Sequence, residues 1–242
     1  MGKLLIWLSA ASVFAIAAPS RAEETASTRS AMTARGVRPY TLAQLGVGLL
    51  TLPAADVCLT ATQCSKGDTS VEIDFWQMYR ASPAFAIGAG ASFALRPTTD
   101  TPTTQMMAES GVTRSHTRSY FLVEAQGRYY WLRFETIEAW FGATAGGVIV
   151  SDRYAVEGGE QPTAALIGPR SSTVRTEGGA LGLLLGGQWS FAPNWGLGIS
   201  ARYMRWFLPH EAATSVFLDR ATLTDQQSVL NFGISCSYRI AL

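Results

Sequence analysis

Two histidines and the serines near them are the residues with which this chain could carry out nucleophilic or acid–base chemistry. A serine nucleophile needs an imidazole within hydrogen-bonding distance and an acid that orients the imidazole. Neither His116 nor His210 has a serine two positions away, the spacing that places both side chains on one face of a strand. We therefore expect no enzymatic activity and expect both histidines to be solvated loop residues. Together with Glu211 they are a sparse ligand set for a metal, so the sequence predicts no metal and no other cofactor.

Ionisable residues also recur at even spacing inside segments whose other positions are apolar. Alternate residues of a strand share one face, so such charges would lie on one side of a sheet and could pair there. Four acids and four arginines make up this set: Glu72, Asp74, Arg80, Glu124, Arg128, Glu138, Arg202 and Arg239. The balance of signs predicts an internal charge network.

The three cysteines divide into a pair and a single residue. Cys58 and Cys64 lie six positions apart in a polar stretch, and we expect a disulfide between them in an oxidising compartment, in preference to free thiols or metal ligands. Cys236 lies among the apolar positions of the last segment, where a thiol acts as a small apolar group.

The elements that would position these side chains are β-strands. The final segment alternates apolar residues with small or polar ones over its whole length; the apolar positions are Leu230, Phe232, Ile234, Cys236, Tyr238, Ile240 and Leu242. A strict period of two predicts a strand with one apolar and one polar face, and its length suits a tilted strand across a bilayer.

Eight such segments occur, each with the ten or more residues that a tilted membrane strand needs. They are Tyr40 to Leu52, Ser70 to Ala81, Ala84 to Arg96, Ser119 to Arg133, Ile137 to Val150, Gly178 to Phe191, Trp195 to Leu208 and Ser228 to Leu242. Short turns alternate with four long loops, Pro53 to Thr69, Pro97 to Arg118, Ser151 to Glu177 and Pro209 to Gln227. This plan predicts an all-β fold, a transmembrane antiparallel up-and-down β-barrel of eight strands.

The two faces of these strands differ in polarity, and this difference indicates which face points outward and which points into the barrel. The alternate positions that are apolar would face lipid. The aromatic residues among them, which gather near the short turns, would form a girdle at the membrane interface. The opposite parity holds the charged set and many glycines, and would fill the interior of an eight-stranded barrel. We favour a paired, non-conducting plug; a narrow polar pore for ions or small solutes is the alternative.

The first residues have the three parts of a secretory signal: Lys3, an apolar run and a small-x-small site before position 23. We expect residues 1–22 to be a cleaved signal peptide, 23–39 a periplasmic lead-in and 40–242 the barrel. Removal of Lys3 and Arg21 leaves 17 of the 19 basic residues against 18 acidic ones, which disfavours nucleic acid as a partner. Charged residues form only 15% of the chain, against about 25% in water-soluble proteins.

On these features the chain resembles the small eight-stranded outer-membrane barrels, the family of the OmpA membrane domain and OmpX. The resemblance covers Tyr40 to Leu242 and includes the alternating last strand, although Leu242 stands where the family usually has a closing aromatic residue. It implies the outer membrane of a Gram-negative cell, a lipid environment, recognition by the barrel-assembly machinery and periplasmic termini. The anchoring role of the longer relatives, which carry a peptidoglycan-binding domain, is not implied.

The expected function is that of a monomeric structural barrel whose four long loops contact an extracellular protein or polysaccharide. A porin-like minor pore is the second hypothesis. A soluble lipocalin-like binder is the third, and it would need the reverse orientation, with apolar residues inside; the charged inward set argues against it.

Overall fold

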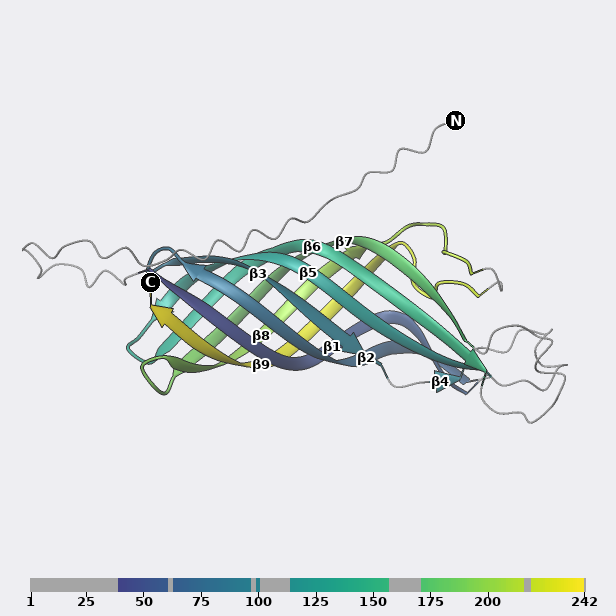
Figure 1. Ribbon diagram of the computed structural model, residues 1–242, viewed down its shortest axis with the longest axis horizontal. Helices are drawn as coiled ribbons and strands as arrows, with labels where there is room; N and C mark the ends of the chain where they lie inside the picture. Colours follow the sequence, from purple (N-terminus) through teal and green to yellow (C-terminus); the bar gives the residue numbers. More distant parts are fainter. Residues whose placement is uncertain are drawn as a thin grey trace, which may run out of the picture. The chain divides into compact units, whose positions relative to one another are not determined.

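The computed structural model describes residues 39–60, 63–96, 99–100, 114–156, 171–215 and 219–241, and these form one closed antiparallel β-sheet (Figure 1). The strand order is β3-β2-β1-β9-β8-β7-β6-β5-β4, and β3 also pairs with β5, which closes the ring. The two-residue β4 continues β3 along β5, so eight long strands build the wall. The eight-stranded antiparallel barrel predicted from the sequence is confirmed.

The strands are β1 (Tyr40–Thr60), β2 (Gln63–Arg80), β3 (Phe85–Leu95), β4 (Thr99–Asp100), β5 (Arg114–Arg133), β6 (Ile137–Val156), β7 (Ser171–Ser190), β8 (Trp195–Phe207) and β9 (Gln226–Ala241). No described segment is a helix long and apolar enough to cross a membrane.

The register of the ring fixes the tilt of the strands. Starting from Thr41 and following paired residues through all eight strands leads back to β1 at Thr51, a stagger of ten residues (51 − 41). With a rise of about 3.3 Å per residue and about 4.8 Å between strands, this stagger gives a tilt of about 40°. Figure 1 shows the strands running obliquely around the barrel.

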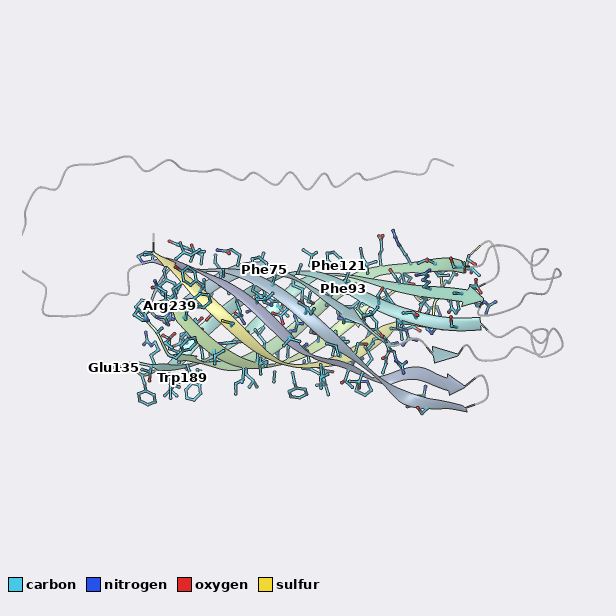
Figure 2. The ribbon with its side chains drawn as sticks, turned by 60° about the horizontal axis from the view of Figure 1, so that its bottom comes forward. Phe75, Phe93, Phe121, Glu135, Trp189 and Arg239 are labelled. Atoms are coloured by element: carbon cyan, nitrogen blue, oxygen red, sulfur yellow. The ribbon has the colours of Figure 1, made fainter. Side chains whose placement is uncertain are left out.

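One end of the barrel carries the short connections. Tyr40 pairs with Ala241, so both ends of the described barrel lie there, beside the turns around Pro83, Glu135 and Pro193. Figure 2 shows Glu135, Trp189 and Arg239 at this short-turn end, and Phe75, Phe93 and Phe121 on the wall. The predicted strand ends on this side are correct to within two residues.

At the opposite, long-loop end, the predicted strand ends are wrong by up to eight residues. β1 and β2 continue as a paired hairpin to Thr60 and Gln63, so most of the predicted loop Pro53 to Thr69 is strand. β6 and β7 likewise extend into the predicted loop Ser151 to Glu177. In β2, β6 and β7 polar residues on both faces hid these extensions, because period-two hydrophobicity reports a strand only where one of its faces is apolar. In β1 the register shift between Leu52 and Asp56 breaks the alternation.

The two faces of the wall are divided as the sequence predicts. The large apolar side chains of one parity are exposed, including Leu183 at 68% and Ile199 at 67%, whereas alternate residues point inward and are mostly buried. Interior glycines make room for large neighbours. A Cβ at Gly90 would lie 2.5 Å from the Trp76 ring, and one at Gly46 would lie 2.6 Å from the Asp74 carboxylate. The wall therefore presents hydrocarbon-like side chains outward and polar side chains inward.

Cys58 lies directly opposite Cys64 in the β1–β2 hairpin. Directly opposed Cα atoms in antiparallel strands are about 4.5–5.5 Å apart, a separation that a disulfide can bridge. The side chains of both residues lie outside the described part, so the disulfide stays a prediction. In secreted protein we expect the intact mass to rise by two hydrogens on reduction; an unchanged mass, with both thiols alkylated before reduction, would contradict it.

Candidate functional site

Among the residues that the structure describes, the ion pairs of the barrel interior form three groups. The first, here the lower cluster, lies at the short-turn end and consists of Arg80, Glu138 and Arg239, with Tyr40. The Arg80 Nη1 atom donates to Glu138 Oε2 at 2.7 Å and to the Tyr40 hydroxyl at 2.8 Å. Arg239 Nη2 lies 3.5 Å from the same Glu138 oxygen. One carboxylate thus bridges arginines from β2 and β9, which are not neighbouring strands.

The second group, the central cluster, is centred on Arg202 of β8. Its guanidinium donates to Glu72 Oε1 of β2 at 2.7 Å and also pairs with Glu124 of β5. Asn231 donates to the other oxygen of Glu72, and the Thr144 hydroxyl donates to Glu124 at 3.1 Å. Glu72 is fully buried and Arg202 nearly so. Charges buried this completely are stable only when they are paired, and here one arginine satisfies two acids from across the barrel.

Beside this cluster is a cavity of about 20 Å³, lined by Asp74, Arg128, Arg202 and other inward residues. Arg128 lies over the Trp140 ring at 4.2 Å. A cavity of this volume has room for about one water molecule.

All eight residues of the predicted charge network line the barrel interior. The structure brings six of them into ion pairs: Glu72, Arg80, Glu124, Glu138, Arg202 and Arg239.

Apolar layers separate the ionic clusters, which the sequence analysis did not predict. Between the lower and central clusters lie Leu42, Trp76, Met78, Ala86, Tyr130, Trp140 and Leu184. On the far side of the central cluster lies a larger layer that includes Leu50, Tyr120, Leu122, Val148, Val150, Met204, Trp206 and Val229. The order is visible on β5, where Tyr120 and Leu122 lie between Arg118 and Glu124. The inward parity is thus not only charged and small, as expected; it also holds tightly packed aromatic and aliphatic side chains.

The third group, the upper cluster, contains Asp68, Arg118, Asp152 and His116. Arg118 is 2% exposed; its Nη1 donates to Asp68 at 2.6 Å and its Nε lies 3.3 Å from Asp152. The Tyr120 hydroxyl donates to Asp68 at 2.6 Å. His116 Nε2 lies 2.7 Å from Asp152 Oδ1, and its ring stacks on Tyr154 at 4.8 Å. The expectation that His116 is a solvated loop residue is wrong, because it belongs to an inward-facing row of β5.

The described part of the connection between β8 and β9 folds over this upper cluster, and we call its residues 208–215 and 219–225 the cap. The backbone N–H and the hydroxyl of Thr222 both donate to Asp152, at 3.0 and 2.6 Å. The Tyr154 hydroxyl donates to the Arg220 carbonyl at 2.6 Å. Leu208 and Leu223 join the larger apolar layer of the barrel. The described part of the predicted loop Pro209 to Gln227 is therefore packed into the mouth. His210 of this cap is exposed, as expected, and pairs with Asp225.

The electrostatics of Asp152 hold the cap in place. Asp152 lies three residues beyond Ile149, the last large outward apolar residue of β6. Burial alone would raise its pKa, but the hydrogen bond with His116, the charge of Arg118 and the bonds from Thr222 together lower the pKa below its ordinary value of 3.8. Because the folded pKa is depressed, the stabilisation is complete above pH 3.8 and is lost as the pH falls through the folded value.

We therefore expect acid to release the cap. Amide hydrogen exchange of residues 219–225, corrected for intrinsic rates, is expected to accelerate when the pH falls from 5 to about 2–3. Asp152→Asn should remove this dependence and exchange rapidly at both pH values, while the amides of β9 at the short-turn end stay protected. Equal protection of the cap at both pH values would contradict the assignment.

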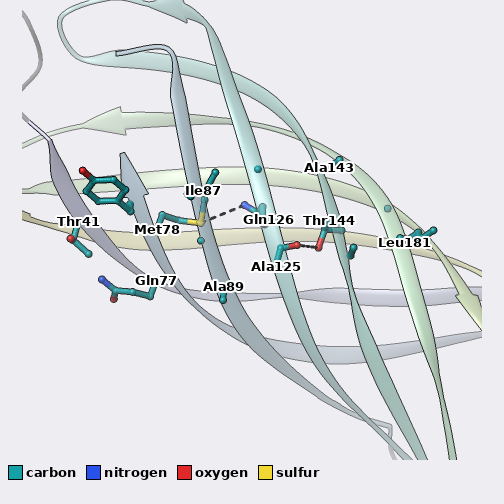
Figure 3. Close-up of a pocket in the computed structure, with 15 residues that line it drawn as sticks. Thr41, Gln77, Met78, Ile87, Ala89, Ala125, Gln126, Ala143, Thr144 and Leu181 are labelled. Atoms are coloured by element: carbon teal, nitrogen blue, oxygen red, sulfur yellow. Dashed lines mark hydrogen bonds between the residues drawn. The ribbon is translucent and has the colours of Figure 1, made fainter. Parts of the chain in front are cut away.

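A shallow apolar hollow of about 910 Å³ lies along the wall (Figure 3). Its exposed lining residues are mostly small, with Ala89, Ala125, Gly127 and Ala143 at its floor. These residues share the parity of the apolar outer face, so the hollow lies on the outside of the barrel and not in its interior. Among the residues that the structure describes, no group of three or more His, Cys, Asp or Glu is arranged to hold a metal.

Sequence reasoning missed the upper cluster although a signal for it exists. Arg118 has the same parity as Tyr120, Leu122 and Glu124, and Asp152 has the same parity as Val150 and Val148. If the series of inward-facing positions on each strand is continued past its last large outward apolar residue, it includes Arg118 and Asp152. The contacts of the cap had no comparable signal, because a segment without strand periodicity does not reveal where it packs.

No family model and no curated protein matches the chain. Solved structures do. The chain is similar to a major outer membrane protein from Thermus thermophilus, with a TM-score of 0.55, 11% identity and coverage of 84% of this chain and 99% of that one. It is also similar to Neisserial surface protein A (TM-score 0.43, 12% identity, 86% and 99%) and to Ail of Yersinia pestis (TM-score 0.43, 14% identity, 83% and 99%). These likenesses concern the fold, and the chain has the fold of the small outer-membrane β-barrels.

Proposed function

We propose that this chain is a structural outer-membrane barrel with a closed interior, which contacts other molecules at the cell surface and does not conduct. The observation that carries the proposal is the layered interior, in which ionic clusters alternate with packed apolar layers beneath the cap. The exposed apolar wall supports insertion in a bilayer, because a water-soluble monomer rarely exposes so large a continuous apolar surface. The fold shared with outer-membrane proteins supports the same location.

Several features argue against a continuous aqueous path. The larger apolar layer crosses the whole lumen, from Leu50 of β1 through Leu122 of β5 to Met204 of β8, and each of these side chains is fully buried. An ion in this layer would lose its hydration without gaining a polar partner, which costs several kcal/mol. Eight strands also leave an interior only wide enough for side chains to fill.

Single-channel recording in planar bilayers tests this closure. We expect purified, folded protein to produce no steady conductance at neutral pH, because the central cluster and the apolar layers block the lumen. Glu124→Gln, which changes the charge of the central cluster, should likewise give no current. A steady conductance in the wild type that changes in amplitude or ion selectivity with Glu124→Gln would contradict closure and support the narrow-pore alternative.

The proposed surface contact rests on the part of the wall that extends past the apolar zone. We use this name for the belt of outward apolar side chains, which on β7 includes Leu181, Leu183 and Leu185. β5, β6 and β7 remain paired up to Arg114, Val156 and Ser171, well beyond the outward apolar residues of these strands. We assign the surface contact to residues 101–113 and 157–170, which follow these strand ends in the sequence. In this proposal the termini are periplasmic, the long-loop end is extracellular, and the partner is a protein or polysaccharide.

Loop replacement tests the surface contact. Residues 101–113 and 157–170 would be replaced together by short Gly-Ser turns in protein displayed on a Gram-negative host that otherwise lacks it. We expect the variant to keep the heat-dependent gel shift of a folded barrel and to lose the adhesion to cell monolayers or abiotic polysaccharide films that the full chain confers. Adhesion equal to that of the full chain, in a folded variant, would contradict the proposed role of these segments.

A further inference from the structure

The outer face of the barrel carries arginines just beyond the apolar zone. On β6 the outward row continues from Ile149 through Ser151 to Arg153, and on β7 it runs from Leu181 through Gly179 and Glu177 to Arg175. Arg175 pairs with Ser151 and Arg153 pairs with Thr173. The two arginines are therefore diagonal neighbours on one outward surface, and both are exposed.

Nothing described in the protein neutralises this pair. Neither guanidinium forms an ion pair or a side-chain hydrogen bond with a described residue. Glu177, two residues from Arg175 on the same face, is also not paired with it. Diagonal positions across two strands are within reach of long side chains, so two like charges here repel unless an anion lies between them. A guanidinium presents a planar fork of donors that matches a phosphate group.

The position of Arg153 and Arg175 along the barrel axis indicates which kind of anion they could bind. Arg153 is four residues past Ile149, and at about 3.3 Å per residue with a tilt of about 40° it lies about 10 Å farther along the barrel axis. The polar headgroup layer on each side of a bilayer is about 5–8 Å thick. Because arginine side chains can bend back toward the membrane while their stems follow the wall, both guanidinium groups reach that layer.

A third outward arginine, Arg205 of β8, lies deeper in the wall. It is in register with Leu181, and exposed Phe207 lies two residues farther toward the long-loop end. Its guanidinium donates to Gln226 at 2.9 Å and to Ser228 at 3.2 Å, both on β9, so it is satisfied within the protein, in contrast to Arg153 and Arg175.

We propose that Arg153 and Arg175 form a binding site for a phosphate group of an outer-leaflet glycolipid of the lipid A type. The hydroxyl of Ser151 lies between them on the same face and provides a further donor. The site holds one lipid at a fixed place on the β6–β7 wall. This inference rests on the membrane location given under the proposed function.

Native mass spectrometry tests the site with full-length folded barrel released from micelles containing equal amounts of lipid A and phosphatidylcholine. We expect the wild type to retain lipid A in preference to phosphatidylcholine. Since an arginine near an anionic lipid surface contributes about 1 kcal/mol, the variant R153A/R175A should bind lipid A about 25-fold more weakly, about fivefold for each arginine. R133A/R220A is the matched control, because it removes two exposed arginines from the opposite end and the cap; it should bind lipid A as the wild type does.

Three results would overturn the proposal. They are equal retention of lipid A by R153A/R175A and the wild type, an equal loss of retention in R133A/R220A, and undiminished retention of lipid A from which the phosphates have been removed. Displacement of lipid A by inorganic phosphate at equal concentration would also contradict it, because the site would then select a free anion. A failure of the proposed membrane location would appear separately, as the absence of a heat-dependent gel shift in the wild type.

Discussion

Arg202→Met is expected to lower the free energy of unfolding by about 3–5 kcal/mol, since removal of one partner from a buried ion pair leaves an uncompensated charge. Two acids lose their partner at once in this case. Glu72 and Glu124 both bind Arg202, and neither has access to bulk water. The methionine side chain fills much of the volume of the aliphatic part of arginine. The loss of unfolding free energy is therefore caused by the unpaired charges and not by a cavity. Urea titration of folded protein in detergent or lipid vesicles, followed by tryptophan fluorescence, measures the effect.

Arg205→Met is the matched control, three residues farther along β8 on the opposite face. Its exposed hydrogen bonds with Gln226 and Ser228 are worth little, so we expect a change within about 1 kcal/mol. The triple variant Arg202→Met, Glu72→Gln, Glu124→Gln should recover most of the stability, because it leaves no buried charge in the central cluster's ion pairs. Equal effects of Arg202→Met and Arg205→Met would show that the central cluster does not hold the barrel together.

Leu183→Arg is expected to destabilise the inserted barrel by about 2–4 kcal/mol, the cost of a cation on the lipid face near the middle of a bilayer. Leu183 is 68% exposed. On a water-soluble protein an exposed leucine can be replaced by arginine with a change within about 0.5 kcal/mol. The substitution therefore separates a lipid-facing wall from a water-facing one, and the readout is the denaturant midpoint of folding into vesicles.

Thr173→Arg provides the comparison for this second substitution. It lies on β7 and faces outward like Leu183, but ten residues nearer the long-loop end and beyond the apolar zone. Its expected cost is about 0–1 kcal/mol, as for positions near the interface. A similar small effect at both positions would mean that Leu183 faces water, and the membrane location would then be wrong.

The sequence was most informative where the wall meets lipid. Between the short turns and the outer limit of the apolar zone, each inward residue alternates with an outward apolar one, so both the strand and its direction could be read from the order of residue types. Glu72, Glu124 and Arg202 could be assigned to the interior in this way. That Arg202 binds both acids depends on the stagger of ten residues around the ring, which no single strand reveals.

Beyond the apolar zone the same reasoning fails for a physical reason. There both faces of the wall meet water or polar groups, and the contrast that marks a strand is lost, which is why Asp68 and Asp152 were assigned to loops. The inward aromatic layers were missed for a different reason. Trp76 follows the outward Phe75 and Trp140 precedes the outward Phe141, so in each pair the sequence does not show which aromatic residue points inward. The glycines beside Trp76 and Trp140 in the barrel give them room inside.

The orientation of side chains along β7 tests the central claim most directly. Spin labels at single cysteines introduced at each position from 180 to 186, in a background in which Cys58, Cys64 and Cys236 are replaced by Ser, would be probed in vesicles with lipid-soluble oxygen and with a water-soluble nickel complex. The account predicts oxygen accessibility that peaks at Leu181, Leu183 and Leu185 and is low at Ala180, Gly182, Leu184 and Gly186, with little access for nickel throughout. Preferential access of the nickel complex to 181, 183 and 185 would place these residues in water and contradict the account.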